Sequence, residues 1–330
     1  MKKKSKLLLI ISLFLIISAC SEKEVAETNN GVESQDQLEV YTTIYPLAFF
    51  TSEIGGSYVD VNSILPAGAD PHSFEPTSKM MVDIAESDLF INNGANLESY
   101  AETIKDTLEN EEVKIIQATK DMDLLTHTHE HEGHDNDQEG LEDSTHKTES
   151  DSHDHGDVDP HVWLDPMLSI ELANTIKDAL IEQMPEKETN FEENFQQLTS
   201  KLSNLDSEFH TVIDHANKKE ILVSHAAYGY WEKAYGLKQV AITGLSSSDE
   251  PSQKEIEQIL QTIEEKNIKY LFFEQNVSSR LASVIQQEAG VETLQLHNLE
   301  VLTDEEMKDN QTYFSIMEKN LKALEKALND

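Results

Sequence analysis

The sequence predicts an α/β protein with two lobes, each built on a mostly parallel sheet, joined by one long helix. Two sets of short β-branched or aromatic segments alternate with longer helical patterns, and an unbroken amphipathic pattern separates the two sets. Alternation of this kind is typical of α/β folds with parallel sheets. The length of 330 residues also favours two domains.

The first set of segments predicts an N-terminal lobe over residues 38–187. Its strand segments are short and rich in β-branched and aromatic residues, and its helical segments repeat apolar residues every three to four positions. The strands are expected at Leu38–Tyr45, Tyr58–Ile64, Asp88–Asn92 and Val113–Ile116, and the helices at Leu47–Ile54, Met80–Ala85 and Leu97–Glu109.

A single apolar stripe predicts the helix that joins the lobes. Its residues recur at alternating steps of four and three, at Phe191, Phe195, Leu198, Leu202, Leu205, Phe209 and Val212. Such a stripe lies on one face of a helix about 40 Å long. We expect a rigid linker helix over residues 188–216. A surface helix packed on one lobe, or a coiled-coil seam, is the alternative interpretation.

The second set predicts a C-terminal lobe over residues 217–330. The same criteria apply as for the first set. Strands are expected at Ile221–Ser224, Gln239–Thr243, Ile268–Glu274 and Glu292–Leu296, and helices at Tyr228–Tyr235, Gln253–Lys266, Ser279–Ala289 and Gln311–Leu328.

The N-terminus predicts export and anchoring. Four lysines precede an apolar run that ends at Ile17 and is too short to span a bilayer, which is typical of a secretory signal peptide over residues 1–19. Ile-Ser-Ala-Cys at residues 17–20 resembles a bacterial lipobox, whose cysteine carries the lipid. We expect a lipid anchor on Cys20 and a flexible polar tether over residues 20–37. An ordinary signal peptide with a chance cysteine is the alternative.

Residues 126–158 form a separate histidine-rich, acidic segment. It holds eleven Asp or Glu residues, almost nothing apolar, and seven histidines, at His127, His129, His131, His134, His146, His153 and His155. This composition cannot form a packed core, so a disordered loop is expected. Imidazole and carboxylate groups together would make accessory, weak sites for divalent metals. A pH-responsive or merely soluble loop is the alternative.

Composition excludes several classes of function. There are 63 acidic and 25 basic side chains, for a net charge of -38, so a nucleic-acid partner is not expected. The single cysteine excludes an intramolecular disulfide framework, a cysteine-based zinc finger and an iron–sulfur cluster.

Four residues form the candidate metal site. Asp-Pro-His occurs at residues 70–72 and again at residues 159–161, and each proline favours a rigid loop that presents its histidine. His225 follows a predicted strand directly, and Glu300 lies just after another. Ligands of open α/β sheets gather at the carboxyl ends of strands. His72, His161, His225 and Glu300 would give a three-nitrogen, one-oxygen set that suits zinc.

This ligand set does not favour catalysis. Three histidines and one carboxylate complete a tetrahedron and leave no obligatory position for a catalytic water. No HExxH, GxSxG, P-loop or GxGxxG motif occurs, and the histidines in His131-Glu132-Gly133-His134 are too close together for a zincin helix. We therefore expect no catalytic residue and no enzyme; a secreted zinc hydrolase is the weaker alternative.

The motifs together resemble one known family. The lipobox, the two Asp-Pro-His motifs, the histidine-rich segment, the linker helix and the segments Leu222–Tyr230, Glu250–Ser252 and Phe273–Glu274 are similar to the cluster A-I substrate-binding proteins of bacterial ABC transporters, and to their zinc-specific branch. The resemblance covers residues from about 38 to the end. It implies two (β/α)4-type lobes joined by a rigid helix, with the metal site in the cleft between them.

The resemblance also implies a function and a ligand set. The metal would be Zn²⁺, bound as a transported ligand by His72, His161, His225 and Glu300, with a water molecule as the alternative to Glu300. The protein would be a monomeric receptor, lipid-anchored on the extracytoplasmic face of the cell membrane, that serves the permease and ATPase of an ABC zinc importer. Longer zinc receptors carry a further C-terminal zinc-binding domain, which a chain ending at Asp330 is expected to lack.

Two further functions stay open within the family. Manganese-specific relatives carry a carboxylate at the third ligand position, so His225 favours zinc over a manganese receptor. A surface adhesin is the other alternative. Among nearby residues, we expect Glu75 to orient a ligand histidine. We expect His297, His210 and His215 not to bind the metal.

Overall fold

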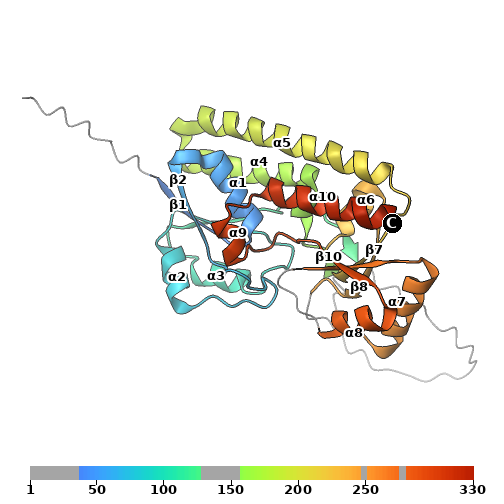
Figure 1. The fold of residues 1–330 in the computed structure, drawn as a ribbon. Helices are drawn as coiled ribbons and strands as arrows, with labels where there is room; N and C mark the ends of the chain where they lie inside the picture. The colour runs from blue at the N-terminus through green and yellow to red at the C-terminus, as the bar shows by residue number, and fades with distance from the viewer. Residues whose placement is uncertain (1–36, 128–156, 247–250, 275–279) are drawn as a thin grey trace, which may run out of the picture. The chain divides into compact units, whose positions relative to one another are not determined.

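The computed structural model describes residues 37–127, 157–246, 251–274 and 280–330 (Figure 1). The predicted signal peptide, Cys20, nearly all of the tether and six of the seven histidines of the histidine-rich segment lie outside these residues. Within the described ranges, no helix is both long enough and apolar enough to cross a membrane.

The first sheet contains all four strands that the sequence predicts for it. They are parallel in the order β2-β1-β3-β4, and they are β1 (Leu38–Thr42), β2 (Val59–Ser63), β3 (Leu89–Asn92) and β4 (Lys114–Gln117). The three predicted helices are also present, as α1 (Tyr45–Gly55), α2 (Ser78–Ala85) and α3 (Ala101–Thr107). A short 3-10 turn, η2 (Gly56–Tyr58), connects α1 to β2.

The second sheet repeats this topology. Its strands are parallel in the order β10-β9-β7-β8, and they are β7 (Glu220–His225), β8 (Lys238–Thr243), β9 (Tyr270–Phe273) and β10 (Glu292–Gln295). Read from β8 to β10, the strands follow the order second, first, third and fourth along the chain, as they do in the first sheet. The helices are α6 (Gly229–Tyr235), α7 (Gln253–Glu265), α8 (Arg280–Ala289), α9 (Asp304–Lys308) and α10 (Tyr313–Asn329).

The predicted linker helix is α5 (Glu188–Asp214), 27 residues long. It contacts α1 and α4 (Pro166–Gln183), which precede it in the chain, and α6 and α10, which follow it (Figure 1). These contacts exclude both a coiled-coil seam and a helix that packs on one lobe alone. Its buried face consists of Phe191, Leu198, Leu202, Leu205, Phe209 and Ile213.

Several elements, among them the short helix α9, were not expected from the sequence. The helix α4 (Pro166–Gln183) begins where the Asp165 carboxylate accepts hydrogen bonds from the amides of Met167 and Leu168. The two-residue strands β5 (Thr126–His127) and β6 (Asp157–Val158) pair antiparallel at the base of the histidine-rich segment. The turns η3 (Val162–Leu164) and η4 (Pro185–Lys187) lie on either side of α4.

One continuous apolar core connects the two sheets. It includes Val40 from the first sheet, Phe272 from the second, and Phe50, Leu202 and Tyr313 from α1, α5 and α10. A smaller apolar core lies on the other face of each sheet. The first sheet forms it with α2 and α3, and the second sheet with α7 and α8. Burial on both faces explains why the inner strands β3 and β9 are almost uniformly apolar, whereas the edge strands β2 and β10 carry exposed polar residues.

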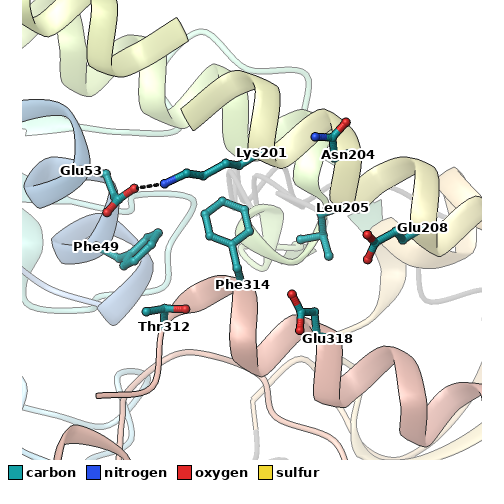
Figure 2. Close-up of a pocket in the computed structure, with 9 residues that line it drawn as sticks. All are labelled: Phe49, Glu53, Lys201, Asn204, Leu205, Glu208, Thr312, Phe314 and Glu318. Atoms are coloured by element: carbon teal, nitrogen blue, oxygen red, sulfur yellow. Dashed lines mark hydrogen bonds and ion pairs between the residues drawn. The ribbon is translucent and has the colours of Figure 1, made fainter. Parts of the chain in front are cut away.

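A surface pocket lies over this core where α1, α5 and α10 meet. Its volume is about 410 Å³, and Figure 2 shows Lys201 reaching Glu53 at 2.8 Å across one end of it. None of the four predicted metal ligands lines it. The four predicted metal ligands therefore lie elsewhere in the fold.

Candidate metal centre

The fold brings all four predicted ligands together. His225 is the last residue of β7, and His161 lies directly before η3. His72 lies in the turn after β2, and Glu300 lies in the segment between β10 and α9. One ligand atom from each residue lies within 4.8 Å of the others. Carboxyl ends of strands from both parallel sheets therefore supply this cluster.

The distances within the cluster match a tetrahedral zinc site. Nε2 of His72 and Nε2 of His161 lie 3.4 Å and 3.5 Å from Oε1 of Glu300. Nε2 of His225 lies 3.4 Å from Nε2 of His161. A tetrahedron with metal–ligand bonds of about 2.05 Å has corners about 3.3–3.4 Å apart. These three of the six donor–donor distances are therefore close to the spacing that such an ion requires, and all six are within 4.8 Å.

The cluster is almost completely shielded from water. The side chains of His161 and His225 are 0% and 1% exposed, and those of Glu300 and His72 are 7% and 12% exposed. His72 is therefore the ligand closest to solvent. An ion held here would exchange its hydration shell for protein donors.

An aspartate orients the ring of His161. Oδ1 of Asp159 lies 2.8 Å from Nδ1 of His161 and also accepts a hydrogen bond from the His161 backbone amide at 2.9 Å. This contact fixes a proton on Nδ1 and directs Nε2 into the cluster, as is usual for metal-binding histidines. In the first Asp-Pro-His motif, Asp70 accepts from the backbone amide of His72 in the same way.

A glutamate occupies the corresponding position at His225. Oε1 of Glu274 lies 2.6 Å from Nδ1 of His225, and Ser224 donates to the same oxygen at 3.2 Å. His225 is the last residue of β7, and Glu274 directly follows the neighbouring strand β9. The register that pairs Leu222 with Leu271 places the two residues opposite each other. Strand pairing therefore sets this contact.

The close packing of these groups shifts two pKa values. Burial lowers the pKa of His161, but hydrogen bonds with Asp159 and Glu300 outweigh it and raise the pKa to about 9. For Glu300, burial raises the pKa, but the hydrogen bonds from His161 and His72 dominate and hold the pKa well below its usual range. Without metal, a protonated His161 thus neutralises an ionised Glu300.

The structure also places the residues that the sequence set aside. His297 is buried beside the cluster but accepts a hydrogen bond from the Leu299 amide and lies 3.3 Å from Glu306, so it is not among the four. His210 and His215 are exposed on α5 or at its end. His127 is in β5, and the other histidines of its segment lie outside the described residues.

One expectation about an orienting carboxylate is wrong. Glu75 is exposed, and Asp159 and Glu274 are the carboxylates beside the ligand rings. Sequence reasoning did not identify Asp159, although its position two residues before His161 in the repeated motif was an available signal. It also left Glu274 undecided, because its approach to His225 depends on how β7 and β9 pair.

Two parallel sheets joined through a long helix, with a buried His3Glu cluster between them, define a two-lobed binding protein built for a metal ion. The family model for "Zinc-uptake complex component A periplasmic" (ZnuA) matches residues 40–327. The chain belongs to the ZnuA family. This is a family of substrate-binding proteins rather than enzymes.

Individual relatives agree with this assignment. The chain is 38% identical over 323 residues to the zinc-binding lipoprotein AdcA of Streptococcus pneumoniae, covering 98% of this chain but only 60% of that protein. It is 34% identical to the high-affinity zinc uptake system protein ZnuA of Bacillus subtilis, over 99% of this chain and 98% of that protein. The crystal structure of the Zn(II)-bound ZnuA-like domain of Streptococcus pneumoniae AdcA superposes with a TM-score of 0.71, at 35% identity, over 89% of this chain and 100% of that chain.

Proposed function

We propose that this protein is a high-affinity zinc receptor that delivers Zn²⁺ to an ABC importer. The observation that carries the proposal is the buried cluster of His72, His161, His225 and Glu300, whose donor atoms all lie within 4.8 Å of one another and in three pairs 3.4–3.5 Å apart. Three imidazole nitrogens and one carboxylate oxygen suit zinc better than manganese, which favours oxygen ligands. The zinc-binding names of the relatives point to the same ion.

The same proposal assigns a place and partners to the protein. Cys20 carries a lipid that holds the folded part at the extracytoplasmic face of the cell membrane, and residues 20–37 act as a tether. The partners are the permease and ATPase subunits of a zinc importer, which the family's role in an uptake complex supports. A net charge of -38 concentrates cations around the receptor. The histidine-rich segment adds weak accessory sites.

Competitive metal titration tests the proposal. Full-length protein is titrated with zinc against a strong chelator, with Mn²⁺ as competitor, and compared with His225→Ala and His210→Ala. We expect one tight site that Mn²⁺ does not displace, that is greatly weakened by His225→Ala, and that is unchanged by His210→Ala, because His210 is exposed on α5. Tight Mn²⁺ binding that zinc cannot displace would instead identify a manganese receptor.

The histidine-rich segment is tested separately. Deletion of residues 128–156 should leave the tight site intact, because the four ligands and the carboxylates beside them lie outside the deleted range. Loss of all tight binding on deletion would show that the segment itself is the site and that the ligand assignment is wrong.

A further inference from the structure

Asn298 lies at the centre of the hydrogen bonds that surround the metal site. It is 3% exposed and lies in the segment between β10 and α9. Its Oδ1 accepts from the backbone amide of Glu300 at 3.1 Å, and its Nδ2 donates to Oε2 of Glu274 at 2.9 Å. Its carbonyl oxygen accepts from the indole N–H of Trp163 at 2.7 Å. Every one of these contacts leads to a different ligand.

The contact with Glu274 leads to His225. One oxygen of the Glu274 carboxylate receives the Asn298 amide, and the other lies 2.6 Å from Nδ1 of His225. The amide therefore determines how the carboxylate is rotated. That rotation in turn determines how the His225 ring is held.

The contact with Trp163 leads to His161. Trp163 follows His161 by two residues, is fully buried, and has its ring centroid 5.3 Å from that of His161. Its N–H bond to Asn298 joins the turn that carries His161 to the segment that carries Glu300.

The segment that carries Glu300 needs such support. Leu299 has φ of 63° and is fully buried, a backbone conformation that is sterically unfavourable for a branched residue. Two hydrogen bonds hold Glu300, the residue after Leu299. Its amide donates to the side chain of Asn298, and its carbonyl accepts from the Tyr45 amide at 2.8 Å. These bonds keep the strained turn in the form that directs Glu300 into the cluster.

We propose that Asn298 is a positioning residue that sets the orientations of Glu300 and His225 together, and so the geometry and affinity of the zinc site. The inference rests on the proposed zinc-receptor function. The amide is required because one side chain must accept from the Glu300 amide and donate to Glu274 at the same time. An aspartate has the same shape but cannot donate, and it would set a second carboxylate against Glu274.

The test compares Asn298→Asp with Asn320→Asp in the full-length protein. Asn320 is 2% exposed and fastens the same segment through the amide and carbonyl of His297, both at 2.8 Å, without contacting a ligand or its carboxylate partner. Each variant thus replaces a buried side-chain amide that is hydrogen-bonded to this segment with a carboxyl group. Zinc affinity is measured by chelator competition, and coordination geometry by the visible d–d absorption of bound Co²⁺, which is intense only for tetrahedral sites.

We expect Asn298→Asp to weaken zinc binding about 10- to 100-fold and to change the Co²⁺ spectrum. Asn320→Asp should keep the wild-type affinity and spectrum in the folded protein. Wild-type affinity and spectrum in Asn298→Asp, or an equal loss in both variants, overturns the inference. A wild-type protein without a tight zinc site instead refutes the proposed function.

A milder variant keeps the test decisive if Asn298→Asp does not fold. Trp163→Phe keeps a six-membered aromatic ring and removes the N–H that reaches Asn298, together with the five-membered ring of the indole. It should weaken zinc binding in the same direction and shift the Co²⁺ spectrum. Unchanged values in that variant would overturn the inference.

Discussion

Zinc binding should displace a proton from His161 at neutral pH. The pKa of His161 is about 9 in the metal-free protein, because its hydrogen bonds with Asp159 and Glu300 outweigh burial. A protonated imidazole cannot bind a metal, so the ion has to expel that proton. Glu300 contributes no proton in this range, because its pKa is held well below its usual value.

The loss of apparent zinc affinity depends on the difference between the pKa of His161 and the pH of the measurement. Each pH unit below the pKa costs a factor of about ten in apparent affinity for one displaced proton. At pH 9 the imidazole is half protonated, so between pH 9 and pH 7 the apparent zinc affinity should fall about 50-fold. An imidazole with the ordinary pKa of about 6.5 would leave the affinity almost level over this interval.

Chelator competition at pH 7, 8 and 9, corrected for protonation of the chelator, measures this slope. Calorimetry at pH 7.5 in two buffers of different ionisation enthalpy counts the protons directly, and close to one per zinc should come from His161. Asp159→Asn provides the control, since it removes a bond that raises the pKa and should reduce the count. An affinity that does not change between pH 7 and pH 9 in the wild type would refute the reasoning.

Three further predictions follow from the same contacts. Asp159→Asn should also weaken zinc binding about 10- to 100-fold at pH 9, because Asp159 orients the His161 ring. Glu75→Gln, at an exposed position, should leave the zinc affinity unchanged. Equal zinc affinities of the two variants in chelator competition would contradict this. The raised pKa of His161 stabilises the folded protein at a pH below the pKa of the unfolded state, and this stabilisation is lost as the pH rises through the folded-state pKa. The free energy of unfolding of the metal-free protein, measured in urea, should therefore fall by up to about 3 kcal/mol between pH 6.5 and pH 9. A higher free energy of unfolding at pH 9 would contradict this. Phe209→Ala should cost about 3–5 kcal/mol in urea unfolding, because the ring is fully buried against Trp231 and Tyr235, and half-buried Phe195→Ala should cost clearly less.

Local periodicity was enough to predict most of the fold. The eight strands of the two parallel sheets and the linker helix follow from patterns that need no knowledge of distant residues. The buried residues of α4 recur every three to four positions, but they include Ser169 and Lys177. Apolar residues that are exposed or half-buried, such as Met167 and Ile170, also obscure the stripe, so the helix was missed. Its start, the Asp165 cap before Pro166, was visible in the sequence.

The sequence by itself indicated the four candidate ligands, because His72 and His161 stand in Asp-Pro-His motifs, and His225 and Glu300 lie at or shortly after the end of a strand. Tertiary structure alone decided what surrounds them. Glu274 reaches His225 because β9 pairs with β7 in one register, and Asn298 reaches Glu274 because β10 pairs with β9 in another. These contacts join residues 49 and 24 positions apart. Strand pairing is non-local, so the local pattern of one segment does not say which strand lies beside it or which residues meet.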